Sequence, residues 1–286
     1  MERRERSGVK RRASVVNGIF YPENREALTE RLFSWGLKEG SAGTSVGGGQ
    51  VILAPHGAWN LTGSIAASAF SAAQNLKERS SRPVNRVLLL GTHHHFAEDG
   101  IYLSESASFE TPLGNIQVDQ KLNRKLASCS TTIKINDIPH LSEHSLEVLL
   151  PMVKYCFPEA KIVPILMGNG SQALISGLGG ALKIVLDEHM EESLIVISSN
   201  VSQSSDPDLA ESMADEFRSL LENMDTRAYL ASFESGGISA CGGALVGSLL
   251  ESGLFDGKSF SALSPFSCSP GENNETVYYG AFVLEN

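Results

Sequence analysis

Histidines follow two runs of apolar residues in the first third of the chain. His56 lies in "LAPHGAW", and His93, His94 and His95 follow the leucines of "LLLGTHHHFAEDG" (residues 88–100). Ligands gather at the carboxyl ends of strands in open α/β sheets, so we expect imidazoles from both runs to meet at one edge of a sheet. Two converging imidazoles indicate a transition-metal site. Two alternatives stay open: His56 only satisfies loop backbone groups, and at least one histidine of the triplet is structural.

A cysteine later in the chain is a separate candidate for reactive chemistry. Cys241 lies among glycines in "ESGGISACGGAL", at the start of a helix expected over 241–253. Free backbone N–H groups and the helix dipole at such a position favour a thiolate. The alternative interpretation is a small buried core residue.

A further histidine stands between two acidic residues in "SEHSLE". The pattern predicts a helix over 142–156 that begins near a capping serine and is kinked or divided at Pro151. On such a helix His144 and Glu147 share a face, with Glu143 beside them. The pair would orient a metal ligand or act as acid and base. The alternative is a first helical turn with favourable acidic residues and no further role.

Two other motifs resemble known signatures but do not carry a function. "GNGSQA" (168–173) follows an expected strand and opens a helix, as a dinucleotide fingerprint does. The next strand ends in "SSN", where an acidic residue for the ribose is needed, so nucleotide binding is not favoured. "SCSPG" (267–271) is a turn from which no hydrolase triad can be assembled.

The elements that would position these residues alternate between β-rich runs and helical patterns. Strands are expected at 50–56, 86–91, 161–168, 193–200, 258–266 and 276–285. Helices are expected at 62–79, 118–128, 171–190 and 207–224, in addition to the two above. This alternation predicts a single α/β domain with a mainly parallel central sheet flanked by helices.

Composition and charge limit the classes of partner. The chain has 286 residues, of which 42% are hydrophobic, and a net charge of −10, which argues against nucleic acid as a partner. Residues 1–12, "MERRERSGVKRR", predict a basic, disordered tail, which leaves 13–286 as the domain. No run approaches the ~20 apolar residues of a membrane span. Four cysteines far apart indicate reduced thiols and a cytoplasmic setting.

Several segments together resemble the Memo family, known in bacteria and archaea as AmmeMemoRadiSam system protein B. They cover nearly the whole chain in order and include "ILAPHGAWNLTGSIAASAF", "LLLGTHHHFAEDGIYLS", "EHSLEVLLP" and "ACGGALVG". The resemblance implies a fold similar to that of LigB-type class III extradiol dioxygenases, which are non-haem iron enzymes. It also implies a functional link to a radical SAM protein.

The resemblance implies a metal site as well. The family's pattern of two histidines and one cysteine falls by motif on His56, His94 and Cys241. His95 is then a neighbour of a ligand, and His93 stands where the family has a serine. A thiolate with imidazoles suits copper, iron or zinc rather than magnesium or calcium.

The chain also departs from the family pattern at the expected cleft. The family's "SSDxSH" segment reads "SSNVSQ" here, so Asn200 replaces an acid and Gln203 replaces a histidine, with loss of charge and basicity. Trp59 stands in the aromatic place of "APHAGY". With His93 and Glu143, these residues are expected to line the pocket. The departures predict an altered or degenerate site.

Three functions remain open at this point. The first is a metal-binding protein with copper, iron or zinc and a redox role, in which His144 or His95 moves protons. The second is a non-catalytic module that binds a peptide or small ligand through Trp59. The third is an iron dioxygenase-like enzyme, although a cysteine would stand where such sites have a carboxylate. The first and third of these functions allow an enzyme, and the second does not.

Overall fold

The computed structural model describes residues 10–40, 50–75, 83–271 and 274–285. Four parallel strands form the middle of an eight-stranded sheet: β2 (Gln50–Ala54), β9 (Ser193–Ser198), β3 (Arg86–Thr92) and β8 (Lys161–Met167). On one side β14 (Phe282–Glu285) runs antiparallel to β2 and β11 (Ser259–Ala262). On the other, β4 (Ile101–Leu103) runs antiparallel to β8 and parallel to β7 (Ile133–Ile135).

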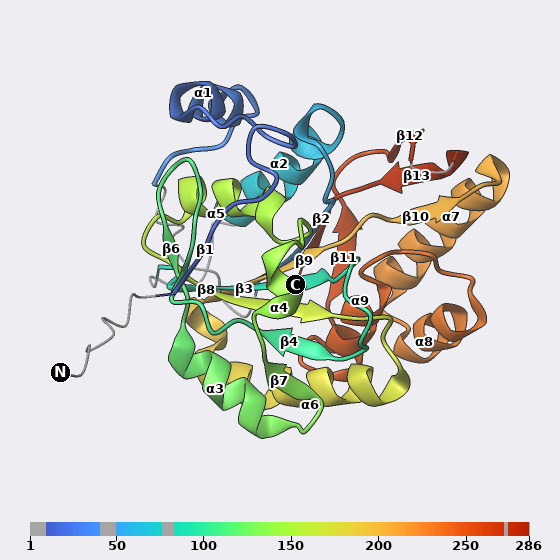
Figure 1. Cartoon of the computed structure of the whole chain (residues 1–286). Helices are drawn as coiled ribbons and strands as arrows, with labels where there is room; N and C mark the ends of the chain where they lie inside the picture. The colour runs from blue at the N-terminus through green and yellow to red at the C-terminus, as the bar shows by residue number, and fades with distance from the viewer. Residues whose placement is uncertain (1–9, 41–49, 76–82, 272–273, 286) are drawn as a thin grey trace.

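Helices cover both faces of this sheet (Figure 1). One face packs on α1 (Arg25–Ser34), α2 (Trp59–Asn75) and α5 (Leu150–Cys156). The other packs on α3 (Gln120–Cys129), α6 (Gln172–His189), α7 (Pro207–Asn223), α8 (Thr226–Ser235) and α9 (Gly243–Glu251). The predicted single α/β domain with a mainly parallel central sheet flanked by helices is therefore confirmed.

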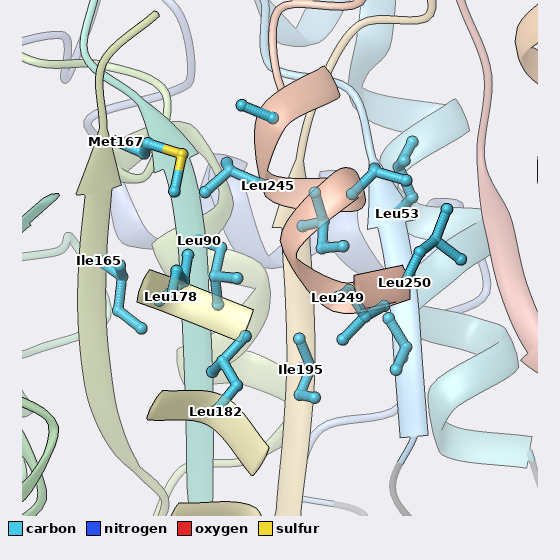
Figure 2. Packing of buried hydrophobic residues seen from close by; sticks show 14 of the residues in the cluster. Leu53, Leu90, Ile165, Met167, Leu178, Leu182, Ile195, Leu245, Leu249 and Leu250 are labelled. Carbon is cyan, nitrogen blue, oxygen red and sulfur yellow. The ribbon is translucent and has the colours of Figure 1, made fainter. Parts of the chain in front are cut away.

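Alternate residues of the central strands enter two separate cores, as the pleat of a strand requires. In β3, Leu88 and Leu90 belong to the core under α6 and α9, whereas Leu89 belongs to the core under α2 and α5. Figure 2 shows Leu90 and Ile195 facing the leucines of α6 and α9. Burial on both faces explains why these strands read as unbroken apolar runs.

Two small sheets and several short elements complete the fold. One sheet joins β1 (Arg11–Arg12), β5 (Ser108–Phe109) and β6 (Ile116–Gln117), and the other joins β10 (Ser202–Ser204), β13 (Thr276–Tyr279) and β12 (Ser267–Pro270). The short helices are α4 (Ile138–Leu141), η1 (Glu147–Leu149) and η2 (Met190–Glu192). Among the described residues, no helix is both long enough and apolar enough to cross a membrane.

Two predicted elements differ from the structure. The helix expected over 142–156 begins only at Glu147, as η1, and continues as α5 with Pro151 in its first turn. The expected division near Pro151 is present, since η1 ends at Leu149 and α5 begins at Leu150, and proline is tolerated there because the first turn has no hydrogen bond for its missing N–H to make. The single strand expected over 276–285 is two strands, β13 and β14, in different sheets.

The N-terminal boundary of the domain also differs from the prediction of a tail over residues 1–12. Arg11–Arg12 forms β1 and pairs with Ser108–Phe109, and Arg12 is only 3% exposed. A buried partner for its charge, Glu147, lies far along the chain and gave no local signal. Residues 1–9, and most of the expected connector at 43–50, lie outside the described residues.

Candidate metal centre

Two strand ends and one helix start position the candidate ligands. His56 lies two residues beyond β2 and His94 two residues beyond β3. Strand β9 lies between β2 and β3 in the sheet, and all three run parallel, so their carboxyl ends share one edge. Cys241 lies two residues before α9, which packs on β3. The structure thus brings the three residues together.

The three side chains are close enough to share one ion. The Sγ of Cys241 lies 3.2 Å from Nε2 of His56. One ligand atom from each of His56, His94 and Cys241 lies within 4.8 Å of the others. An ion that makes metal–nitrogen and metal–sulfur bonds of ~2.0–2.3 Å needs its ligand atoms within a few ångströms of one another, as they are here. This donor set therefore fits a transition-metal ion.

A hydrogen-bond chain sets the tautomer of His56. Its Nδ1 lies 2.8 Å from Oγ of Ser198, and that hydroxyl donates its proton to the carbonyl of Ser145 at 2.6 Å. Because a serine hydroxyl has one proton, Ser198 must accept from Nδ1–H of His56. The Nε2 nitrogen, which faces Cys241, is therefore the ring atom left to interact with the sulfur or with an ion.

Glu143 performs the same task for His94. One carboxylate oxygen accepts from Nδ1 of His94 at 2.9 Å, and the other accepts from the backbone N–H of His94 at 2.6 Å. The N–H of Ser145 adds a third donor at 2.8 Å. Burial opposes ionisation of Glu143, but these hydrogen bonds hold its pKa well below the usual range. Its carboxylate therefore leaves Nε2 of His94 as the ring nitrogen available to the cluster.

Neighbouring groups favour a thiolate at Cys241. Burial by itself would raise its pKa, but the charge of His56 and hydrogen bonds from both histidines lower it well below the usual value. The backbone N–H of Asn200 also donates to Sγ, at 3.0 Å. For His94 the effects have the opposite signs. Burial lowers its pKa, but hydrogen bonds with Cys241 and Glu143 outweigh burial and raise the pKa to about 10. Both shifts act in the direction that favours a protonated His94 beside a thiolate at Cys241.

The two other candidate histidines lie beside this cluster. The ring of His144 stacks on that of His94, with centroids 4.9 Å apart, and its Nδ1 lies 3.3 Å from the Glu143 carboxylate. Burial, together with the charge of His56, lowers the pKa of His144 to about 4, so its ring is neutral near pH 7. His95 is exposed, with its ring 6.3 Å from those of His94 and His144.

The expected His144–Glu147 pair does not form, because the helix that would have paired them begins only at Glu147. The Glu147 carboxylate instead binds Arg12, the hydroxyl of Tyr21 and two backbone N–H groups of the N-terminal segment.

The expected pocket residues divide into two groups. Glu143 and Asn200 belong to the site, and the Oδ1 of Asn200 accepts from the backbone N–H of His56 at 3.2 Å. Trp59, His93 and Gln203 point elsewhere. The ring of Trp59 is 4% exposed and donates from Nε1 to the carbonyl of Val148.

The other two residues of the second group have different surroundings. His93 is buried between the rings of Phe96 and Tyr102, and its ring nitrogens have no hydrogen-bond partner among the described residues. Gln203 is exposed in β10, where its backbone N–H donates to Ser239. Local sequence did not distinguish these three from Asn200 and Glu143.

Sequence reasoning missed Ser198 and Ser145, which orient His56 through their hydrogen bonds. The signal that could have found Ser198 is its place at the end of β9, the strand that lies between the two histidine-bearing strands. Ser145 offers no comparable signal, because it acts through its backbone.

The sequence of this chain is similar to those of known proteins over most of its length. The profile of a family described as Memo-like protein matches residues 11–269. A MEMO1 family protein of Nitrosopumilus maritimus is 26% identical over 277 residues, which cover 94% of this chain and 98% of the relative. A MEMO1 family protein of Pyrococcus furiosus is 30% identical over 195 residues, which cover 66% of this chain and 63% of the relative.

Among solved structures, an uncharacterized protein of Escherichia coli K12 has a TM-score of 0.48 and 16% sequence identity. The match covers 83% of this chain and 100% of that chain.

Proposed function

The chain belongs to the Memo family, as its motifs predict, and from that premise we propose that it binds one copper or iron ion through His56, His94 and Cys241. One observation supports this above the others. Both imidazoles have their Nδ1 occupied by a hydrogen bond, so both leave Nε2 for the position that the Cys241 sulfur also faces. Metal-binding histidines are typically oriented in this way by carboxylate or other acceptors.

The chemistry of the donors narrows the choice of ion. A thiolate with two neutral imidazoles suits copper, iron or zinc and does not suit magnesium or calcium. Three protein ligands leave a coordination position for another molecule. Copper or iron bound there would supply one-electron redox chemistry, which is the role that we propose.

The surrounding residues have distinct tasks in this proposal. Glu143 and Ser198 fix the rings of His94 and His56, respectively. The N–H of Asn200 donates to the sulfur and so reduces the negative charge that Cys241 presents. His144 is a neutral imidazole beside His94 at the edge of the site, and with a pKa of about 4 it offers a hydrogen-bond acceptor there near pH 7.

The test is the metal content of untagged protein, measured by mass spectrometry after aerobic and anaerobic purification. We expect near-stoichiometric copper or iron in the wild-type protein and its loss in His94→Ala and Cys241→Ala. Cys268→Ala is the matched control, because Cys268 is an exposed cysteine in β12, and it should keep the metal. Absence of both copper and iron from every preparation, even where zinc is present, or equal content in all variants, would overturn the proposal.

A second candidate, binding of a peptide or small ligand, is supported by one observation. Phe20, Tyr21 and Trp59 line a hollow of about 330 Å³ that also contains Arg31. Phe20 contacts His144 with ring centroids 5.3 Å apart, so the hollow adjoins the candidate metal centre. Ligand binding that persists after metal chelation and is lost in Phe20→Ala would support this function.

A further inference from the structure

We propose that Arg12 is a positioning residue of the metal centre. It holds the turn of residues 140–147 in the place where the Glu143 carboxylate meets His94. The inference rests on the proposed function, since it concerns how that site is kept in shape.

Arg12 reaches three acceptors in this one turn. Its Nε donates to the carbonyl of His140 at 2.9 Å, and its Nη2 donates to the carbonyl of Glu143 at 2.7 Å. Its Nη1 pairs with the carboxylate of Glu147. Arg12 and Glu147 are 3% and 1% exposed, so the contact is shielded from water. One guanidinium thus ties both ends and the middle of the turn.

The turn needs an external donor because it has little regular backbone structure. Residues 142–146 lie between α4 and η1 and belong to no helix or strand. Buried carbonyl groups without partners are costly, and the planar guanidinium supplies donors in a fixed geometry that an ammonium group does not reproduce. The backbone of Glu143 is held at its carbonyl by Arg12, while its side chain holds His94.

The other half of the ion pair anchors the N-terminal segment itself. The Glu147 carboxylate accepts from the backbone N–H groups of Val15 and Val16 at 2.9 Å and from the hydroxyl of Tyr21 at 2.9 Å. Strand β1, which carries Arg12, pairs with β5 in a small sheet beside the main one (Figure 1). The donor is therefore itself fixed, as a positioning group must be.

A purely structural role for Arg12 makes a different prediction. Buried ion pairs often contribute little net stability, and their removal as a pair is frequently tolerated. If Arg12 only neutralises Glu147, Arg12→Lys keeps the charge and the metal centre is unaffected. If Arg12 positions Glu143, Arg12→Lys loses the fork that reaches the two carbonyl groups, and the metal centre weakens even in a folded protein.

Arg86 offers a matched control. Its guanidinium also bridges two carboxylates, those of Asp119 and Glu192. It stands at the first residue of β3, whereas His94 lies two residues beyond the last, so the whole strand, ~20 Å long at ~3.3 Å per residue, separates them. Arg86→Lys perturbs an arginine–carboxylate pair that is more exposed than that of Arg12, and it leaves Glu143 untouched.

The experiment compares the wild-type protein with Arg12→Lys, Arg12→Met/Glu147→Gln and Arg86→Lys. The double variant removes both charges while the introduced amide keeps an acceptor for the N-terminal N–H groups, so it guards against misfolding of the single variant. Copper(I) affinity is measured by competition with a chromogenic chelator. In the metal-free proteins, the Nδ1–H signal of His94 is followed by NMR of ¹⁵N-labelled histidine and assigned with His94→Gln.

We expect both Arg12 variants to bind copper(I) ~10-fold or more weakly and to lose or shift the His94 signal, with Arg86→Lys unchanged in both. Equal effects in the Arg12 and Arg86 variants, or an unchanged His94 signal in both folded Arg12 variants, would overturn the inference. If the wild-type protein binds no metal, the proposed function fails, and the His94 signal still decides the role of Arg12.

Discussion

Acidification should destabilise this protein through a histidine outside the metal centre. His140 lies in α4, is 1% exposed and has Nε2 3.1 Å from the carbonyl of Tyr102, so the neutral ring donates there. Its Nδ1 has no hydrogen-bond partner among the described residues. Burial lowers the pKa of His140 from 6.5 to about 4, because the surroundings do not solvate a charged ring.

The sign and size of the effect follow from the two pKa values. Below pH 6.5 the unfolded chain binds a proton at His140 that the folded protein does not bind, so the free energy of unfolding falls as the pH falls. Between about pH 7.5 and about pH 5 the loss is about 2 kcal/mol. It approaches about 3.4 kcal/mol once the pH is below the folded pKa of His140.

Urea unfolding followed by tryptophan fluorescence across this pH range measures the effect. The variant His140→Gln keeps an N–H donor for Tyr102 but does not titrate. The stability difference between wild type and His140→Gln should therefore shrink by about 2 kcal/mol on going to about pH 5. Contributions from other histidines, such as the half-buried His144, cancel in this difference. An equal difference at every pH would refute the reasoning.

Three further changes probe the site and the core. Glu143→Gln places an amide N–H₂ against N–H donors of His94 or Ser145, so metal affinity in the chelator competition should fall ~10–100-fold. Trp59→Phe leaves the carbonyl of Val148 without its donor, and urea unfolding should show a loss of about 1–3 kcal/mol. Leu90→Ala opens a cavity under α6 and α9, and the same unfolding assay should show a loss of about 2–5 kcal/mol.

The order of the main elements could be read from the sequence because burial leaves a local pattern. Strands β8 and β9 are unbroken apolar runs, since each is covered on both faces by helices. The same local signals located α6 and α7 to within one residue at each end. They did not reveal α8 or the split between β13 and β14, because short elements bury too little surface to show a clear period.

Part of the candidate site could also be predicted from the sequence. His56 and His94 follow strands, so their meeting at one edge follows from parallel topology alone. The addition of Cys241 came from the family resemblance, since nothing local links a helix start to two strand ends far away in the chain. The orientation of both rings depends on Ser198 at the end of β9 and on the turn that carries Glu143 and Ser145, both remote in sequence from the histidines.

By itself, then, the sequence determined the layered α/β architecture and the types of residue that could bind a metal. Only the tertiary structure decided which polar groups meet. It paired Glu147 with Arg12 instead of His144, and it buried Trp59 away from the cluster while leaving Gln203 exposed. The physical reason is that apolar burial is encoded in local periodicity, whereas a hydrogen bond or ion pair depends on the position of a partner that the chain brings in from elsewhere.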